Sequence, residues 1–385
     1  MASFESTMRV TSNPRIIHAA ALLRPSLGML NQMKIEQHAA ELLGLYWDVR
    51  MFTLVTPRTE DIGRDYSAIL LAKSASRAPF PQPIRWIYSR WSFYRWLLRQ
   101  QSSYDAYVLR YYVHDPFQLL FLYRCKKPTF LVHHTLEEQE LGASDSPISS
   151  IRFLLERIIG PYAIRASRGV IGVTREIVNH EVHRSGQKNS KWSHIYPNGT
   201  IIEESTLIDR RSPKTPELLF LANFSPWHGL DLLLDSLEGN SDDFVLHVVG
   251  KCRDQLPNEQ SKDVRVVYHG EIGETQIAAL SEQCWIGIAP LALHRKSMRS
   301  ACPLKTREYL KNGLPVYGGS PDIFPQDYPF YMTGPAEIRE ILKYSFTARN
   351  CSKEDVRMFS SKYIDKIQLL DGLYKSICSE ITTKP

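Results

Sequence analysis

The segment CPLKTREYLKNGLPV, residues 302–316, has the signals of a short helix whose start serves a function. Pro303 suits the first position of a helix and Gly313 the position just past its end, so we expect a helix over about 303–312. The start of a helix exposes unpaired backbone N–H groups and the positive end of the helix dipole. Lys305 adds a full positive charge in the same turn. Two positive features together indicate an anion, most simply a phosphate.

Glu308 lies three residues after Lys305 and therefore on the same face of the expected helix. A carboxylate one turn further along accepts hydrogen bonds from a pair of sugar hydroxyls. A phosphate and two hydroxyls at this spacing describe a nucleotide diphosphate with its ribose. The alternative is an ordinary Lys–Glu pair on a surface helix, which is common at this spacing.

Strand-like and helix-like runs alternate on both sides of this segment, and the pattern starts again half-way along the chain. The alternation predicts an α/β fold of two doubly wound parallel sheets with helices on both faces. The join is expected near YPNGTIIEES, 196–205, where Pro, Asn and Gly interrupt the pattern. The expected strands are 15–22, 47–54, 104–111, 128–135, 168–174, 217–224, 244–250, 264–270, 285–291 and 315–319. The expected domains are 1–200 and 201–355, followed by a helical segment over 356–385.

Length and composition agree with two globular domains. The 385 residues exceed one ordinary core, and 43% of them are hydrophobic, which excludes a disordered chain. The six cysteines form no C-x-x-C pair, which argues against a disulfide framework or a zinc site and fits a reducing cytoplasm. No apolar run in the sequence approaches the length of a membrane span, so we expect a cytoplasmic protein.

The charge is uneven along the chain. Residues 1–200 carry 25 Lys and Arg against 16 Asp and Glu, a balance of +9, whereas the remainder carries −3. A basic first half favours an anionic partner, such as a membrane surface, a phosphate-bearing acceptor or nucleic acid, and the alternative is a solvated basic face. No nucleic-acid-binding motif is present, so nucleic acid is not expected as a partner.

The segment FPQPIRWIYSRWSFYRWLLRQ, residues 80–100, is rich in aromatic residues and arginine. On a helix, one apolar stripe is flanked by Arg90 and Arg95, with Arg85 and Arg99 pointing away. This combination suits a peripheral helix at a bilayer interface, and the alternative is a helix packed inside the first domain. The expected stripe is Ile84, Ile87, Trp91, Tyr94 and Leu98.

The segment PLKTREYLKNGLPVYGG, 303–319, resembles the corresponding segment of glycosyltransferase family 4, whose members have the GT-B fold. Further similar segments follow in the family's order, and in the first domain Gly28 and FLVHHT, 130–135, match more loosely. The similar segments are IYPNG at 195–199, LLFLANFSPWHGLDLLLDSL at 218–237, HVVG at 247–250, VVYHGEI at 266–272 and IGIAPL at 286–291.

The resemblance implies roles for particular residues. Glu308 would hold the nucleotide ribose, while Lys305 and the backbone around Pro303 and Leu304 would lie by the diphosphate. Gly250 would line the base pocket.

On the first-domain side, His134 would lie near the transferred sugar, with His133 competing for that role. Gly28 would let the backbone approach the diphosphate or the acceptor. The resemblance also implies retention of the anomeric configuration, no metal and no cofactor beyond the nucleotide-sugar donor.

Two positions depart from the family pattern. The phosphate loop, which includes Ser225, commonly carries an arginine and then a lysine before a glycine; here Asn223 lies near the first position and His228 occupies the second. Histidine can donate to a phosphate but carries less charge near neutral pH. Eight residues before Glu308 the family commonly has a glutamate, and here Ser300 leaves the donor sugar open.

The loop HRKSMR, 294–299, either shares phosphate or carboxylate binding through Arg295 or is only solvated.

We therefore expect a retaining, metal-independent glycosyltransferase that moves a sugar from a nucleotide-sugar donor to a hydroxyl of a glycan or lipid-linked acceptor in bacterial surface polysaccharide assembly. The expected catalytic residues are His134, Lys305 and His228. Their main task is to stabilise the negative charge that develops on the leaving diphosphate. One alternative is an inactive GT-B scaffold in a glycan-assembly complex, which the departures at 223, 228 and 300 motivate. Another alternative is a nucleotide-sugar epimerase.

Overall fold

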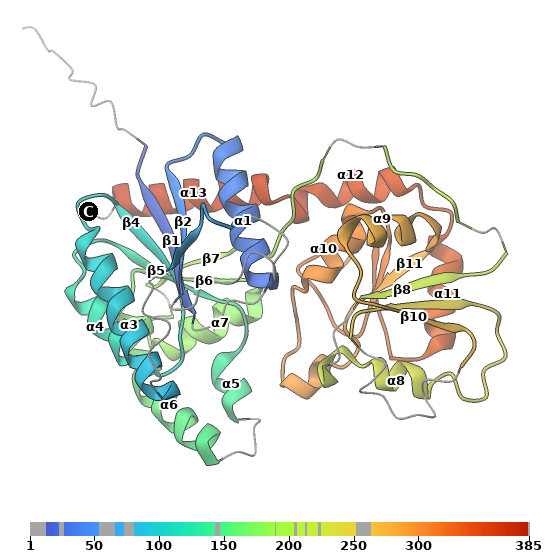
Figure 1. The fold of residues 1–385 in the computed structure, drawn as a ribbon, viewed down its shortest axis with the longest axis horizontal. Coiled ribbons are helices and arrows are strands. Elements are labelled where there is room, and N and C mark those ends of the chain that lie inside the picture. Colours follow the sequence, from blue (N-terminus) through green and yellow to red (C-terminus); the bar gives the residue numbers. More distant parts are fainter. Residues whose placement is uncertain are drawn as a thin grey trace, which may run out of the picture.

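The chain forms two α/β domains that face each other, as Figure 1 shows. A computed structural model describes residues 13–22, 27–53, 66–72, 81–142, 147–188, 190–203, 206–211, 214–221, 225–251 and 263–383. Within these residues all paired strands of both sheets run parallel, as the strand–helix alternation predicts. The candidate residue Asn223 lies outside the described residues.

The first domain has a sheet of seven described strands in the order β3-β2-β1-β4-β5-β6-β7. Helices α1 and α13 pack on one face of this sheet, and α3, α4 and α6 cover the other (Figure 1). The elements are β1 (Ile16–Leu22), α1 (Leu27–Leu42), β2 (Trp47–Thr53), β3 (Leu70–Ala72), α3 (Gln82–Arg99), β4 (Ala106–Arg110), α4 (Pro116–Arg124), β5 (Thr129–His133), α5 (Glu137–Gly142), α6 (Pro147–Ala166), β6 (Gly169–Gly172), α7 (Arg175–Arg184) and β7 (Trp192–Ile195).

The second domain repeats the winding with six described strands in the order β10-β9-β8-β11-β12-β13. Its two main apolar clusters lie on opposite faces of the sheet, one with α8 and α11 and the other with α10 and α12. The elements are β8 (Glu217–Leu221), η1 (Pro226–His228), α8 (Leu230–Asp235), β9 (Val245–Val249), β10 (Val266–Gly270), α9 (Glu274–Gln283), β11 (Ile286–Ile288), η4 (Leu293–Lys296), α10 (Leu304–Lys311), β12 (Val316–Gly318), β13 (Tyr331–Thr333), α11 (Ile338–Ala348), α12 (Lys353–Ile364) and α13 (Lys366–Thr383).

The chain crosses between the domains at two adjacent places. Thr200 N donates to Ile364 O at 2.8 Å, and Lys366 N donates to Thr200 O at 2.8 Å, so the two crossings pair through their backbones. The C-terminal segment is helical, but only α13 packs on the first domain, whereas α12 belongs to the core of the second. The crossing therefore lies near Asp365 and not at 356, because Val356 and Ile364 are buried in the second domain.

Helix α3 forms where the sequence predicts it, but the expected stripe is divided between buried and exposed positions. Tyr94 is buried, whereas Ile84, Ile87 and Trp91 are exposed together with Tyr88. Arg90 is buried too and lies 3.4 Å from Asp115 through its Nε, so it does not flank the stripe. The exposed apolar side chains of α3 are Ile84, Ile87, Tyr88 and Trp91. Among the described helices, none combines the length and the apolar character that crossing a membrane requires.

Candidate functional site

Helix α10 begins in the space between the domains, and its first turn carries the charge that the sequence predicts. Pro303 is the extended N-cap residue, and no side chain caps the N–H groups of this helix. Lys305 Nζ lies 3.2 Å from His228 Nε2, so the two proposed phosphate ligands meet at the helix start. The helix ends before Gly313, whose φ of 71° is the left-handed conformation that glycine adopts readily.

The loop after β8 places His228 beside that helix. Ser225 is the extended residue before the short helix η1, and His228 is buried at its end. Gly229 follows with a φ of 73°, and a Cβ atom there would press on Leu291 and Ala292. The turn that presents His228 to Lys305 therefore depends on glycine.

A buried ion pair fixes α10 in place. Arg307 donates from both terminal nitrogens to the Asp322 carboxylate, at 2.6 and 2.7 Å, and from Nε to Asn198 O at 3.1 Å. Arg307 and Asp322 are almost completely enclosed. The guanidinium thus ties α10 both to the loop after β12 and to the first crossing between the domains.

A cavity of about 280 Å³ lies between the first sheet and α1, and we call it the first-domain cavity. Its mouth brings together Gly28, His134 and Leu304, three residues that the sequence singles out. A Cβ atom on Gly28 would lie 3.9 Å from Leu304 Cδ1, so the start of α1 approaches the start of α10 closely. The other lining residues include His18, Gln32, Glu36, Arg110, Tyr196, Asn198 and Lys366.

Glu36 organises the floor of the first-domain cavity. Its carboxylate lies 2.5 Å from His18 Nδ1, accepts from Tyr196 Oη at 2.9 Å and lies 3.4 Å from Lys366 Nζ. Burial disfavours ionisation of Glu36, but the charges of His18 and Lys366, with hydrogen bonds from His18 and Tyr196, hold its pKa well below the ordinary value. Sequence reasoning missed this group, although a histidine inside the apolar strand RIIHAAAL was a signal.

A second, smaller cavity of about 180 Å³ lies between the domains. His134, Pro303 and Leu304 line it, together with Trp227 and Lys296. Burial, and then the nearby Arg110 guanidinium, lower the pKa of His134 well below its ordinary value, so its imidazole is neutral near pH 7. The structure thus places His134 at both cavities and next to the start of α10.

Glu308 lines a third cavity, of about 420 Å³, which His134 does not line. The cavity wall includes Thr200, Glu274 and Lys311, and the Glu308 carboxylate accepts a hydrogen bond from Asn312 Nδ2 at 3.0 Å. Gly250 follows β9 with a φ of 123°, a conformation that side chains disfavour. The candidate ribose ligand Glu308 and the candidate phosphate ligand Lys305 therefore lie on one helix, but Lys305 does not line the cavity that Glu308 lines.

Two candidates on the 294–300 loop make contacts with the protein itself. Arg295 donates to both oxygens of Asp231, at 3.0 and 2.8 Å. Ser300 donates from its backbone N and its Oγ to Glu176 Oε2, at 2.7 and 2.9 Å, and Glu176 comes from α7 of the opposite domain. Lys296 likewise lies 2.8 Å from Glu140 of α5. This loop is a contact between the domains.

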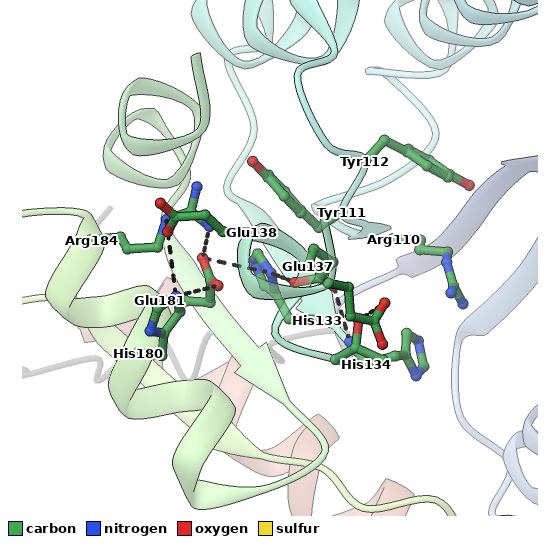
Figure 2. Close-up of polar contacts among 12 residues, drawn as sticks. Arg110, Tyr111, Tyr112, His133, His134, Glu137, Glu138, His180, Glu181 and Arg184 are labelled. Carbon is green, nitrogen blue, oxygen red and sulfur yellow. Dashed lines mark hydrogen bonds and ion pairs between the residues drawn. The ribbon is translucent and has the colours of Figure 1, made fainter. Parts of the chain in front are cut away.

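His133 points into a buried cluster on the other face of the first sheet, as Figure 2 shows. Its ring stacks on Tyr111 with centroids 4.3 Å apart, and Nδ1 lies 3.2 Å from Glu137 Oε2. Glu137 Oε1 accepts from the backbone N of His134 at 3.3 Å, so one carboxylate holds both histidines. Alternation along β5 explains why neighbouring histidines face different environments.

The cluster also holds the one set of potential metal ligands found among the described residues, namely His133, Glu137 and Glu181. Arg184 Nη1 donates to Glu181 Oε2 at 2.8 Å, so a cation already compensates these carboxylates. Burial raises the pKa of Glu181 to about 7, although His133 and Arg184 act in the opposite direction. The pKa of His133 is raised because Glu181 and Glu137 outweigh its burial. We describe this group as a buried ion-pair network.

Known structures share this architecture over almost the whole chain. No family model and no curated sequence matches the chain. The apo form of the lipopolysaccharide outer core galactosyltransferase WaaB superposes with a TM-score of 0.62 at 12% identity, covering 95% of this chain and 99% of that one. HepE from Anabaena, in complex with UDP and glucose, gives 0.64 at 12% identity, with 94% and 99% covered. Sucrose-phosphate synthase from Thermosynechococcus elongatus gives 0.67 at 14% identity, with 95% and 100% covered.

The fold is GT-B. At these identities the likeness establishes the fold alone, and the two parallel sheets that face each other are what it rests on. In this GT-B chain, α10 of the second domain and the end of β5 in the first domain converge on the space between the domains.

Proposed function

We propose that the chain is a glycosyltransferase that moves a sugar from a nucleotide-sugar donor to a hydroxyl of a glycan or lipid-linked acceptor. The observation that carries the proposal is the start of α10, where uncapped backbone N–H groups, Lys305 and His228 converge between the domains. Such a site stabilises the charge that develops on a leaving diphosphate. The solved structures of HepE with UDP-glucose and of an α-glucosyltransferase with UDP support a nucleotide donor for a chain of this fold.

The proposed reaction retains the anomeric configuration and uses no metal. The acceptor oxygen bonds to the anomeric carbon as the bond from that carbon to the diphosphate oxygen breaks, and the acceptor proton passes to the leaving phosphate. Because the leaving group accepts this proton, a pair of catalytic carboxylates is not required. The diphosphate is held by Lys305, His228 and the N–H groups of α10. Glu308 binds the ribose, and His134 lies next to the transferred sugar.

A thermal-shift comparison of nucleotides tests the donor site. Binding to the folded state alone raises stability by about 2.7 kcal/mol when the ligand is at a hundred times its Kd. We expect one diphosphate nucleotide, such as UDP among UDP, GDP and ADP, to raise the melting temperature of the wild type by several degrees. Glu308→Ala should lose most of this shift, whereas Glu340→Ala, at an exposed position of α11, should retain it. If no nucleotide shifts the wild type, the inactive scaffold becomes the better description.

We also propose that the first domain rests on an anionic membrane surface, in line with a lipid-linked acceptor in surface polysaccharide assembly. Helix α6 exposes more apolar side chains than α3, and α4 packs against both helices. Both helices also reach His114, where Arg152 Nε lies 2.9 Å from Nε2 and the Trp86 ring lies 6.5 Å away. The exposed apolar residues of α6 are Ile148, Ile151, Leu154, Leu155, Ile158 and Tyr162. Apolar anchors beside arginines suit a bilayer interface.

Vesicle sedimentation tests this surface. We expect the wild type to sediment with vesicles containing phosphatidylglycerol and to remain in solution with phosphatidylcholine alone. Ile151→Glu combined with Ile158→Glu should abolish sedimentation, because the two substitutions place charge at the interface. Met358→Glu, at an exposed apolar position on α12 of the second domain, is the matched control. Equal sedimentation of both variants would exclude α6 as the contact.

A further inference from the structure

We propose that the first-domain cavity binds an anionic sugar as the acceptor, with Arg110 holding its carboxylate or phosphate, Gln32 accepting from one of its hydroxyls and His18 donating to another. This inference rests on the proposed transfer reaction and names the class of molecule that receives the sugar. Three side chains of the cavity lining support it, because each keeps hydrogen-bonding groups for a ligand: Arg110, Gln32 and His18.

Arg110 supplies a positive charge that lines the cavity without forming an ion pair there. It ends β4, and its guanidinium donates from Nη1 to Met29 Sδ at 3.8 Å. Figure 2 accordingly draws no ion pair from it. The cavity lining contains one further cation, Lys366, and one carboxylate, Glu36, and these two lie together at 3.4 Å. Arg110 also lowers the pKa of Glu137, which lies outside the cavity lining and pairs with His133. Within the lining Arg110 is the cation without an ion pair, and a guanidinium binds carboxylate and phosphate through paired hydrogen bonds.

Two side chains near this charge keep hydrogen-bonding groups for a ligand. Gln32 Oε1 is a buried acceptor without a hydrogen-bond partner among the described residues. His18 uses Nδ1 for Glu36, so Nε2 is the ring nitrogen that remains for a ligand, and in the charged imidazole it is a donor. Buried acceptors are nearly always satisfied in folded proteins, and a hydroxyl of a ligand would satisfy Gln32.

The spacing of these groups fits one sugar residue. Val132 pairs with Arg110, and His18 pairs with Val108, two residues earlier on β4. At the rise of a strand, His18 and Arg110 are therefore about 7 Å apart along the strand direction. A volume of about 280 Å³ is at the lower end for small-molecule sites, which favours a single ring over a long chain.

The first-domain cavity reaches the start of α10, where we place the donor diphosphate. Gly28 and Leu304 meet there, and Lys305 follows Leu304 on α10. An acceptor ring held by Arg110 would thus present a hydroxyl at the end of the cavity nearest the proposed diphosphate. The cavity is lined almost wholly by the first domain, as a separate acceptor site requires.

Calorimetric titration of the full chain tests the proposal with three probes: glucuronate, glucose 6-phosphate and neutral glucose. We expect one of the two anionic sugars to bind at least tenfold more tightly than glucose, and the preferred one identifies carboxylate or phosphate as the recognised group. Arg110→Met should remove the preference, Arg110→Lys should retain part of it, and Arg339→Met, an exposed arginine on α11, should retain all of it. Gln32→Met should lower the affinity for all three probes to a similar degree.

Equal binding of charged and neutral sugars, or an undiminished preference in Arg110→Met, would overturn the proposal. The nucleotide experiment with Glu308→Ala keeps the two conclusions separate. If a nucleotide raises the melting temperature but anionic sugars bind no better than glucose, only the acceptor assignment fails. If no nucleotide raises the melting temperature, the proposed transferase activity fails as well.

Discussion

At the scale of single residues, similar side chains have different surroundings because of the faces they occupy. His133 and His134 are neighbours in sequence, yet the first lies in a buried ion-pair network and the second lines the cavities between the domains. The fold explains the difference, since successive residues of a strand point to opposite faces. Sequence alone left the choice between them open.

Glu181 makes the stability of the first domain depend on pH. Burial raises its pKa to about 7 in the folded chain, above the ordinary value of 4.5. A carboxyl whose pKa is raised by folding binds its proton more tightly in the folded chain. Its contribution to stability is fully present below pH 4.5 and is lost as the pH rises through about 7. The raised pKa of His133 acts in the same direction. We expect the free energy of unfolding to fall by on the order of 2 kcal/mol between pH 5 and pH 8.

Urea denaturation at several pH values checks this expectation. Glu181→Gln should flatten the pH dependence of the free energy of unfolding, because an amide does not titrate. Glu238→Gln, at an exposed position, should leave this pH dependence unchanged. A Glu181→Gln variant with the slope of the wild type would show that other groups control it.

The candidate residues were partly visible in the sequence. Lys305 and His228 lie 3.2 Å apart at the start of α10, and His134 lines a cavity with Pro303 and Leu304 of the same segment, because parallel sheets bring strand ends together. Their catalytic roles stay predictions. Arg110 and Gln32 were missed. Their significance is that Arg110 forms no ion pair in the cavity lining and that Gln32 Oε1 has no donor among the described residues, and only the folded chain reveals this.

At the scale of elements, local signals predicted α10 well and misjudged α3. Pro303 and Gly313 bound α10 within one residue of the expected limits. Helix α3 carries aromatic residues around most of its surface, so periodicity did not decide its buried face. Tertiary packing determines which face of α3 is buried: Tyr94 lies against Phe121 of α4, with ring centroids 5.5 Å apart.

The position of α10 depends on the buried pair between Arg307 and Asp322. Asp322→Asn removes one charge and leaves the guanidinium enclosed without its counter-ion, which costs about 3–5 kcal/mol. We expect urea denaturation to show this loss, accompanied by a weaker nucleotide-induced thermal shift. Asp371→Asn breaks an exposed pair with Lys375 and should cost less than about 1 kcal/mol. Similar losses in the two variants would contradict a special role for the buried pair.

At the scale of the whole molecule, α13 completes a domain distant from it in sequence. Leu370, Leu373, Tyr374 and Ile377 are buried in the core of the first domain, beside strands formed much earlier in the chain. Sequence reasoning placed a crossing helix here through family resemblance, but the exact crossing point depends on backbone pairing between Thr200 and its neighbours in space.

Leu373→Ala should therefore destabilise the first domain although it lies beyond the second in sequence. A fully buried leucine replaced by alanine costs about 2–5 kcal/mol. Hydrogen exchange should show lost protection in β1 and α1 and little change in β8 and β9. Met358→Ala, exposed on α12, is the control, and a loss confined to the second domain would refute the assignment.

The return of α13 also sets an order of events during synthesis. The ribosome makes every strand of the first sheet, then the second domain, and only afterwards the helix that covers part of the first core. Domains usually fold as units while the chain emerges, the N-terminal one first. Here the earlier domain keeps an apolar surface open until the later one has been translated. Its nascent form is a natural client for a chaperone, and the second domain is the first that can finish folding.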